Sequence, residues 1–135
     1  MKKIILFLTV TFSLMACQNT SPSKDLVEGT YNVTNVETQD VTTFNVSIVI
    51  DETKTKLSGK SACNSYAGAL TLGENNTFDA DKLGLTRMYC KDQMEIERSF
   101  IEAMTAVSNY MFDGEVLLLN TTEGKTLIKA QLQKK

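Results

Sequence analysis

The chain has 135 residues, of which 42% are hydrophobic and 22% charged, and its formal net charge is −2. This length suits one compact domain, and the composition is that of a globular protein, so two large domains and extensive disorder are both excluded. A mildly acidic chain without a cluster of basic residues lacks the electrostatic signature of nucleic-acid binding, and the absence of His removes the commonest general base and metal ligand.

The first 17 residues have the pattern of a bacterial export signal. Two lysines precede an apolar stretch within residues 4–14, which is shorter than the roughly 20 residues that a membrane-spanning helix needs. Residues 14–17, with the sequence LMAC, resemble a lipobox, where a lipoprotein signal peptidase cuts before a diacylglyceryl-modified Cys. We therefore predict that residues 1–16 are a lipoprotein signal peptide and that Cys17 is lipidated. An ordinary secretory signal cut near the same place, which would leave a soluble protein, is the alternative.

Residues 17–25 connect this signal to the rest of the chain. They are polar and contain the single proline, Pro22, which suits a tether between a lipid anchor and a folded domain. Loss of the two signal-peptide lysines would leave 12 of the 14 basic side chains against 16 acidic ones, a charge of −4. We expect a lipid-anchored protein of the cell envelope. If the host has two membranes, Gln18 after the Cys favours the outer one, by resemblance to the known sorting rule.

Residues 26–135 form one predicted domain that is mostly β-structure. Its segments are rich in β-branched residues, several alternate apolar with polar side chains, and turn residues separate them. Gly84 introduces an irregular stretch into one segment, and Glu123 with Gly124 predicts a hairpin turn before the last one. The predicted strands cover residues 29–36, 44–50, 57–63, 66–72, 78–88, 116–119 and 126–132.

The apolar period changes between residues 92 and 111. Asp92 and Glu95 have the spacing of a capping box, and apolar residues then follow at steps of three and four from Ile96 to Met111. This pattern predicts an amphipathic helix of about 18 residues whose apolar stripe packs on the sheet. The expected fold is therefore α+β: a single compact domain with a strongly curled, barrel-like antiparallel sheet covered by one helix.

Assigning Cys17 to the lipid leaves Cys63 and Cys90 as an even pair in an oxidising compartment. A disulfide between them would close a loop of about 28 residues and contribute about 3–4 kcal/mol in the chain-entropy model. Two buried, reduced thiols are the alternative. Zinc binding is not expected, since two Cys without His and without C-x-x-C spacing cannot complete a tetrahedral site.

The chain offers weak candidates for catalysis. Ser61 has no His to activate it, and Lys60 beside it would face the opposite side of a strand. Two acidic pairs could act as paired carboxylates, but each is better interpreted as a solvated face or as helix N-terminal charge. These pairs are Glu95 with Glu97 and Asp79 with Asp81. We expect no catalytic residue, no cofactor and no metal.

Two short segments carry a family resemblance: residues 57–68, LSGKSACNSYAG, and residues 85–90, LTRMYC. Together they resemble the META/HslJ domain family, whose pattern is G-x-x-G-C-N-x-x-x-G followed by T-x-M-x-C and an acidic helix start. Ala62 departs from it, because the family often has Gly before the first Cys. The matching residues are Gly59, Cys63, Asn64, Gly68, Thr86, Met88 and Cys90.

The matching residues also have a structural interpretation. Gly59 and Gly68 permit tight bends or a close approach of two backbones, and Asn64 can bond to local backbone and tolerate an unusual φ. Thr86 and Met88 would point the same way on a strand and become fixed neighbours of Cys90. We expect all of these roles to be structural rather than catalytic.

The resemblance extends over residues 26–132 and implies a non-enzymatic domain associated with stress responses of the bacterial envelope. We therefore expect a monomeric, membrane-anchored module that binds an envelope protein. The alternative is a carrier or pilotin-like module that holds an apolar or lipid ligand between sheet and helix. Its possible lining residues are Met88, Met104, Met111 and Phe112.

Overall fold

The computed structural model describes residues 23–134. The predicted signal peptide of residues 1–16, Cys17 and most of the predicted tether lie outside the described residues. Among those that are described, no helix has the length and apolar character needed to cross a membrane.

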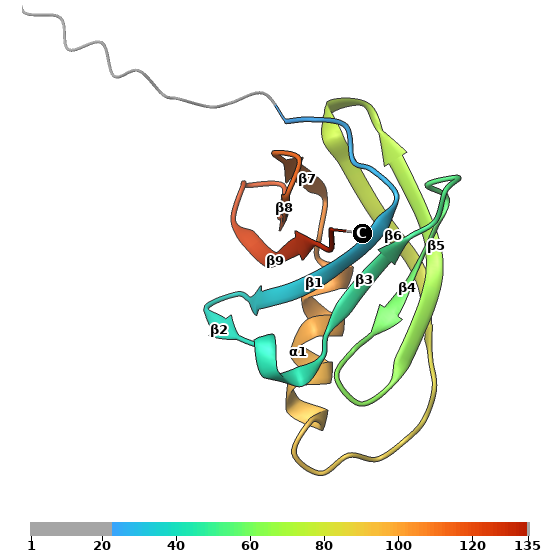
Figure 1. The fold of residues 1–135 in the computed structure, drawn as a ribbon, viewed down its shortest axis with the longest axis vertical. Coiled ribbons are helices and arrows are strands. Elements are labelled where there is room, and N and C mark those ends of the chain that lie inside the picture. Colours follow the sequence, from blue (N-terminus) through green and yellow to red (C-terminus); the bar gives the residue numbers. More distant parts are fainter. Residues whose placement is uncertain (1–22, 135) are drawn as a thin grey trace, which may run out of the picture.

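The domain is a nine-stranded antiparallel sheet that curls into a ring, with one α-helix (Figure 1). The spatial order of the strands is β2-β1-β3-β4-β5-β6-β7-β8-β9, and pairing of β1 with β9 closes the ring. This architecture confirms the predicted α+β class and the barrel-like sheet. The strands are β1 (Gly29–Val36), β2 (Gln39–Asp40), β3 (Ser47–Ile50), β4 (Lys56–Lys60), β5 (Ser65–Gly73), β6 (Thr77–Leu85), β7 (Asn109–Phe112), β8 (Val116–Asn120) and β9 (Thr126–Leu132).

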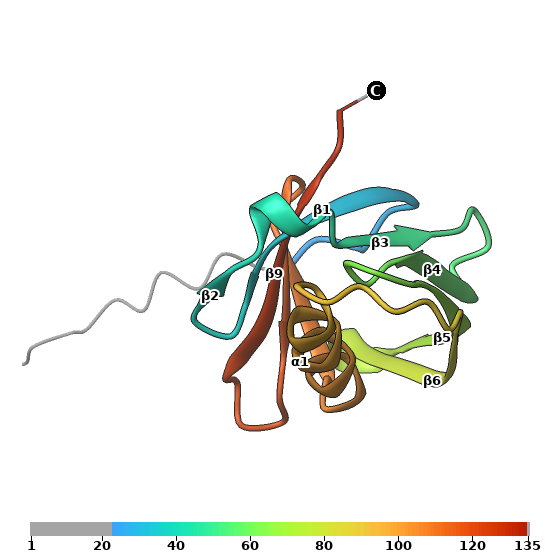
Figure 2. The same ribbon diagram turned by 90° about the horizontal axis from the view of Figure 1, so that it is seen from below.

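The helix α1 (Met94–Thr105) lies at the weakest place in the ring. The strands β6 and β7 share a single residue pair, Thr77 with Asn109, whereas β5 and β6 pair along almost their full length. Seen from below, α1 lies between β9 and β6 (Figure 2). The helix packs against β9, β1 and β6.

The predicted boundaries of the helix were wrong at both ends. Gln93, not Asp92, is the N-cap residue, and no side chain caps the helix start. The helix ends at Thr105, and Tyr110 and Met111, which were assigned to its last turn, belong to β7. In β7, Tyr110 and Phe112 alternate inward and pair with Leu119 and Leu117 of β8. In the sequence, Tyr110 also fits the end of the helical pattern, which is why this strand was assigned to the helix.

Strands β3, β4 and β6 are also shorter than predicted. A 3-10 turn, η1 (Thr42–Phe44), precedes β3, and a second, η2 (Glu74–Asn76), joins β5 to β6. The chain leaves the strand geometry after Lys60 and again after Leu85. These two early ends matter, because the residues that follow them form the polar cluster described below.

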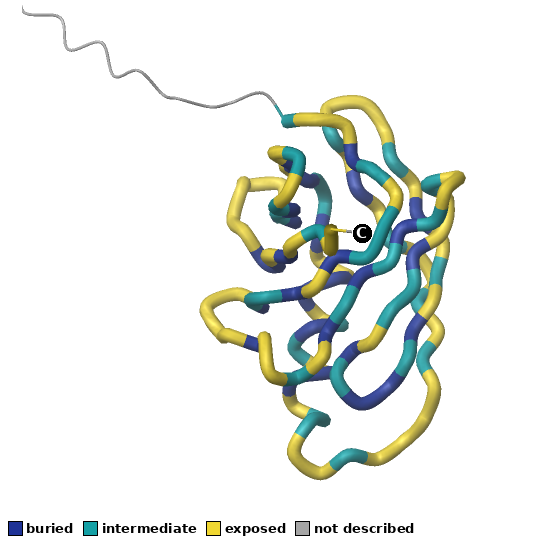
Figure 3. Tube along the Cα trace, in the orientation of Figure 1, coloured by how far each residue is buried: buried dark blue, intermediate teal, exposed yellow. Residues whose placement is uncertain are grey.

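The buried apolar residues form one continuous cluster inside the ring. Figure 3 shows how buried and exposed residues are distributed along the chain. The largest fully buried side chains of the cluster are aromatic: Tyr31, Phe78 and Phe100. The ring of Phe100, from α1, lies 5.4 Å from the ring of Tyr66 on β5, so the helix is packed directly against the sheet. Burying one side chain of this size contributes about 2–3 kcal/mol.

Two glycines allow the close approach of neighbouring strands. A Cβ on Gly59 would collide with the backbone carbonyl oxygen of Ser47 on β3. A Cβ on Gly68 would lie 2.8 Å from the carbonyl oxygen of Asp81, where the register of β5 and β6 shifts. Neither position has room for a side chain unless the backbone moves.

Candidate functional site

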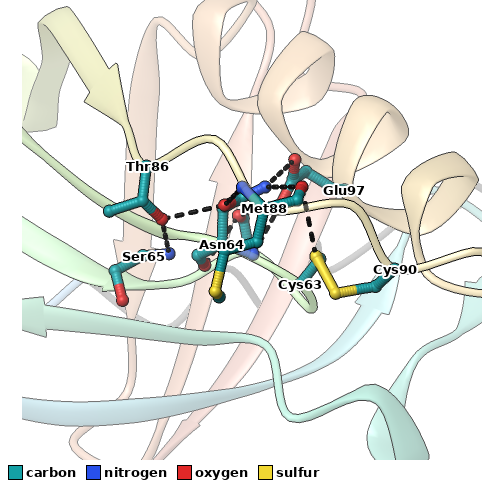
Figure 4. The surroundings of a disulfide bond; sticks show 8 residues. Cys63, Asn64, Ser65, Thr86, Met88, Cys90 and Glu97 are labelled. Carbon is teal, nitrogen blue, oxygen red and sulfur yellow. Dashed lines mark hydrogen bonds between the residues drawn. A yellow bond between two sulfur atoms is a disulfide. The ribbon is translucent and has the colours of Figure 1, made fainter.

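The segments that follow β4 and β6 meet at one end of the barrel, and a disulfide joins them (Figure 4). Cys63 and Cys90 are bonded, with their Cα atoms 5.7 Å apart. This finding confirms the predicted bridge and replaces the alternative of two reduced thiols. Cys63 is buried and Cys90 is partly exposed, so the bridge ties the outer loop, residues 86–93, to the domain.

Asn64 is the hub of this region. Its side-chain oxygen accepts hydrogen bonds from the Met88 N–H at 2.7 Å and from the Thr86 hydroxyl at 2.8 Å. Its side-chain amide donates to the Met88 carbonyl at 3.1 Å and to Glu97 Oε1 at 2.9 Å. All four hydrogen-bonding positions of the side chain are therefore used. These partners are 22 to 33 residues away in the sequence, so the prediction of local bonding was wrong.

Glu97 is buried, with 7% of its surface exposed, although it is ionisable. Its Oε2 accepts hydrogen bonds from the Ser61 hydroxyl at 2.7 Å and from the Asn64 N–H at 2.8 Å. Burial alone would raise the pKa of Glu97, but these bonds and that of the Asn64 side chain outweigh it and hold the pKa below its ordinary value. The interpretation of Glu97 as part of a solvated helix face was wrong.

The backbone turns sharply between Ser61 and Asn64. The Ser61 N–H donates to the Asn64 carbonyl at 2.8 Å, and Ala62 has a φ of 87°. Only glycine adopts such a left-handed conformation without strain. The unusual φ that was expected at Asn64 is thus at Ala62, the position where the META/HslJ pattern often has Gly.

Thr86 and Met88 do not lie on a strand, because β6 ends at Leu85. The Thr86 hydroxyl bonds to Asn64 and accepts the Ser65 N–H at 3.1 Å. The backbone of Met88 is held by Asn64, but 54% of its surface is exposed. The expectation that both side chains share a strand face beside Cys90 was therefore wrong.

Sequence reasoning found the two Cys and Asn64 as family positions but missed Glu97 as their partner. A signal was present: Glu97 precedes Phe100 by three residues and Met104 by seven, which places it on the buried side of α1. Its hydrogen-bond donors, Ser61 and Asn64, come from another part of the chain, and no local pattern predicts that pairing.

This Asn64 cluster, defined as Ser61, Asn64, Thr86 and Glu97 with the backbone of Met88, is chemically saturated. Within residues 23–134, no buried side-chain nitrogen or oxygen lacks a hydrogen-bond partner. The Ser61 side chain is fully buried, and its hydroxyl already donates a hydrogen bond to Glu97. The same part of the chain has no group of three or more potential metal ligands. The arrangement fits a clasp that fastens two loops to the start of α1.

Several open grooves lie on the outside of the domain. One of about 530 Å³ runs over β1 and β9 beside η1, and one of about 320 Å³ lies between the β1–β2 turn and α1. The four residues suggested as the lining of an apolar cavity do not come together. Met104 and Phe112 are buried in the core, whereas Met88 and Met111 are exposed.

Three solved structures share this fold. A DUF4847 family protein from Bacteroides vulgatus is 17% identical with a TM-score of 0.60, and the match covers 81% of this chain and 95% of that one. A protein from Burkholderia xenovorans, studied by NMR, is 17% identical with a TM-score of 0.66 and full coverage of both chains. A further NMR structure is 24% identical with a TM-score of 0.61, and the match covers 79% of this chain and 91% of that one. At these identities the similarity concerns the fold.

No curated protein sequence matches this chain. The META domain family model, however, matches residues 24–134, nearly the whole described domain. The match includes both short segments that carry the resemblance and the helix that supplies Glu97. The chain therefore belongs to the META domain family.

Proposed function

We propose that this protein is a lipoprotein anchored to the cell envelope through Cys17, and that its META domain is a non-catalytic module that binds another envelope protein. The observation that carries the proposal is the Cys63–Cys90 disulfide. Structural disulfides form and persist in oxidising compartments outside the cytoplasm. A domain fastened in this way suits the destination that the N-terminal sequence encodes.

The start of the domain supports the tethered arrangement. The Lys24 N–H donates to the Phe112 carbonyl at 2.7 Å, and the Ser23 hydroxyl accepts the Phe112 N–H at 3.0 Å. The chain is thus fixed to β7 from Ser23 onward. Ser23 is six positions after Cys17, and a segment of this length spans at most about 20 Å. A lipid on Cys17 would hold the domain close to the membrane surface.

A binding role fits the chemistry of the domain better than catalysis does. The buried side chains of Ser61, Asn64 and Glu97 bind one another, and the charged carboxylate of Glu97 is stabilised by hydrogen bonds from neutral groups. A general base needs access to a substrate proton, which this carboxylate lacks. In a host with two membranes we place the protein at the outer one.

The test is mass spectrometry of the protein purified from its own envelope. We expect a mature N-terminus at Cys17 carrying a diacylglyceryl group, and we expect the Cys17→Ser variant to keep its leader. A soluble product with an unmodified Cys17 would contradict the proposal. Lipid extraction of the same sample addresses the carrier alternative, because a co-purified apolar ligand near unit stoichiometry would favour it over the binding module.

A further inference from the structure

We propose that the exposed tip of the outer loop, Arg87, Met88 and Tyr89, is the surface through which this domain binds its protein partner. The proposal rests on the function proposed above and names the site. Among residues 23–134, only three large apolar side chains are strongly exposed, and two of them are adjacent here. Met88 is 54% exposed and Tyr89 is 80% exposed, whereas the third, Met111, is 39% exposed and stands apart on β7.

The tip is exposed but its backbone is firmly held. Asn64 binds both the N–H and the carbonyl of Met88, and the disulfide at Cys90 fixes the chain directly after Tyr89. On the other side, the Thr86 N–H donates to the Ser65 carbonyl at 3.0 Å. A loop fixed on both sides of its exposed side chains loses little conformational entropy when it binds. The Asn64 cluster therefore supports binding as well as stability, since it holds the tip in one conformation.

The residue types at the tip favour a protein partner. Arg, Met and Tyr are all enriched in the buried centres of protein interfaces, and Tyr and Arg dominate their binding energy. In a chain with more acidic than basic side chains, residues 86–91 contain two cations, Arg87 and Lys91, and no carboxylate. Asp92, which is exposed, follows directly and limits the local positive charge. The partner surface that would complement this tip is an apolar pocket with carboxylates at its rim.

The position of the tip favours a protein, rather than the anchoring membrane, as its binding partner. The outer loop lies at the end of the barrel opposite to the start of the described chain, where the tether joins the domain (Figure 1). The short tether would keep the Ser23 end next to the lipid, so the tip would point away from that membrane. A protein within the envelope can reach the tip in this orientation.

The test uses the full-length, lipidated protein in its own cells, with a photo-crosslinking amino acid at Tyr89 in one variant and at Met111 or Thr38 in two others. We expect a discrete adduct with one envelope protein from position 89 and none from the other two. The purified partner should then bind the wild-type protein at least tenfold more tightly than the Tyr89→Ser variant. Met111→Ser is the matched control and should bind like the wild type.

Each other outcome counts against the site. Adducts with lipid or with a second copy of this chain would overturn the assignment of the tip to a partner protein. A partner captured from Met111 or Thr38 but not from Tyr89 would overturn this site and leave the proposed function intact. The absence of any protein adduct from all three positions would contradict both. Because the Tyr89 side chain is exposed, Tyr89→Ser should unfold at the wild-type temperature, and lost binding could not be attributed to misfolding.

Discussion

The middle of the barrel and its disulfide end both contain fully buried side chains, but these side chains differ in chemistry. Phe100 and Leu117 belong to one cluster of buried apolar side chains, whereas Ser61, Asn64 and Glu97 are buried and bind one another through hydrogen bonds. Apolar packing depends mainly on volume and tolerates similar shapes. A saturated polar cluster depends on the identity of each partner, because one removed group leaves others unpaired. The two regions should therefore respond differently to substitution.

The largest effect should come from the apolar region. Phe100→Ala removes a fully buried ring that joins α1 to Tyr66, and we expect it to lower the free energy of unfolding by about 4 kcal/mol. Urea denaturation followed by circular dichroism measures this change. Phe100→Leu preserves most of the volume and should cost less than half as much. Equal losses in the two variants would show that the region does not respond to volume.

The disulfide should contribute somewhat less. It links positions that are 27 residues apart, so replacing both Cys63 and Cys90 by Ser should lower the free energy of unfolding by about 3 kcal/mol. The domain should still fold, because the Asn64 cluster holds the same loop. Cys17→Ser in the otherwise wild-type chain controls for the loss of a thiol outside the bridge and should leave the free energy of unfolding unchanged. Complete unfolding of the double variant would mean that the cluster cannot hold the loop alone.

The Asn64 cluster should show a specific rather than a large response. Asn64→Ala removes the partner of the Met88 N–H and one of the three hydrogen bonds that Glu97 accepts, and we expect a loss of about 2 kcal/mol. Hydrogen exchange of the Met88 amide should become much faster in this variant, while that of Tyr110 on β7 should change little. Asn32→Ala, at an exposed asparagine on β1, is the matched control and should have almost no effect. An unchanged Met88 amide would contradict the role of Asn64 as the hub.

Sequence reasoning succeeded where the pattern was local. The apolar and polar alternation in the β-regions and the turn residues between them gave the correct class, and the last strand was placed within its observed limits, Thr126–Leu132. The Cys63–Cys90 pair followed from counting, since lipidation of Cys17 leaves two. The helix was extended too far because Tyr110 fits both a helical stripe and an inward-facing strand position.

The interior of the site could not be predicted in the same way. Asn64 and Glu97 are 33 residues apart, and their contact depends on how the ring closes. Glu97 was judged from its neighbours at the start of the helix, where acids are usually solvated. Here the helix start faces the 61–64 turn, so the same carboxylate is buried and accepts three hydrogen bonds. Tertiary contacts, not local preference, decide its environment.

Glu97 also makes stability depend on pH. Its pKa is lowered in the folded protein, so its contribution is fully present above the ordinary pKa of a glutamate and is lost as the pH falls through the folded value. In Glu97→Gln, an amide replaces the carboxylate beside donors on Ser61 and Asn64. We expect the variant to be less stable than the wild type at neutral pH, and the gap to narrow on acidification. Denaturation curves at several pH values measure the difference in free energy of unfolding between the two proteins. A difference that stays the same as the pH falls would contradict this role of Glu97.

The smallest effect should be a gain. Ala62 has a φ of 87°, and an alanine in this left-handed region costs about 1–2 kcal/mol relative to glycine. Glycine increases the entropy of the unfolded chain by about 0.5–1 kcal/mol, which offsets part of this relief. Ala62→Gly should therefore stabilise the domain by about 0.5 kcal/mol.

Ala67→Gly, on an exposed position of β5 without a positive φ, should instead destabilise it by about the same amount. Thermal unfolding of the two variants should give shifts of opposite sign, because only at Ala62 does the fold demand a conformation that favours glycine. Shifts in the same direction would show that the strain at Ala62 is absorbed by the flexible turn rather than carried by the backbone.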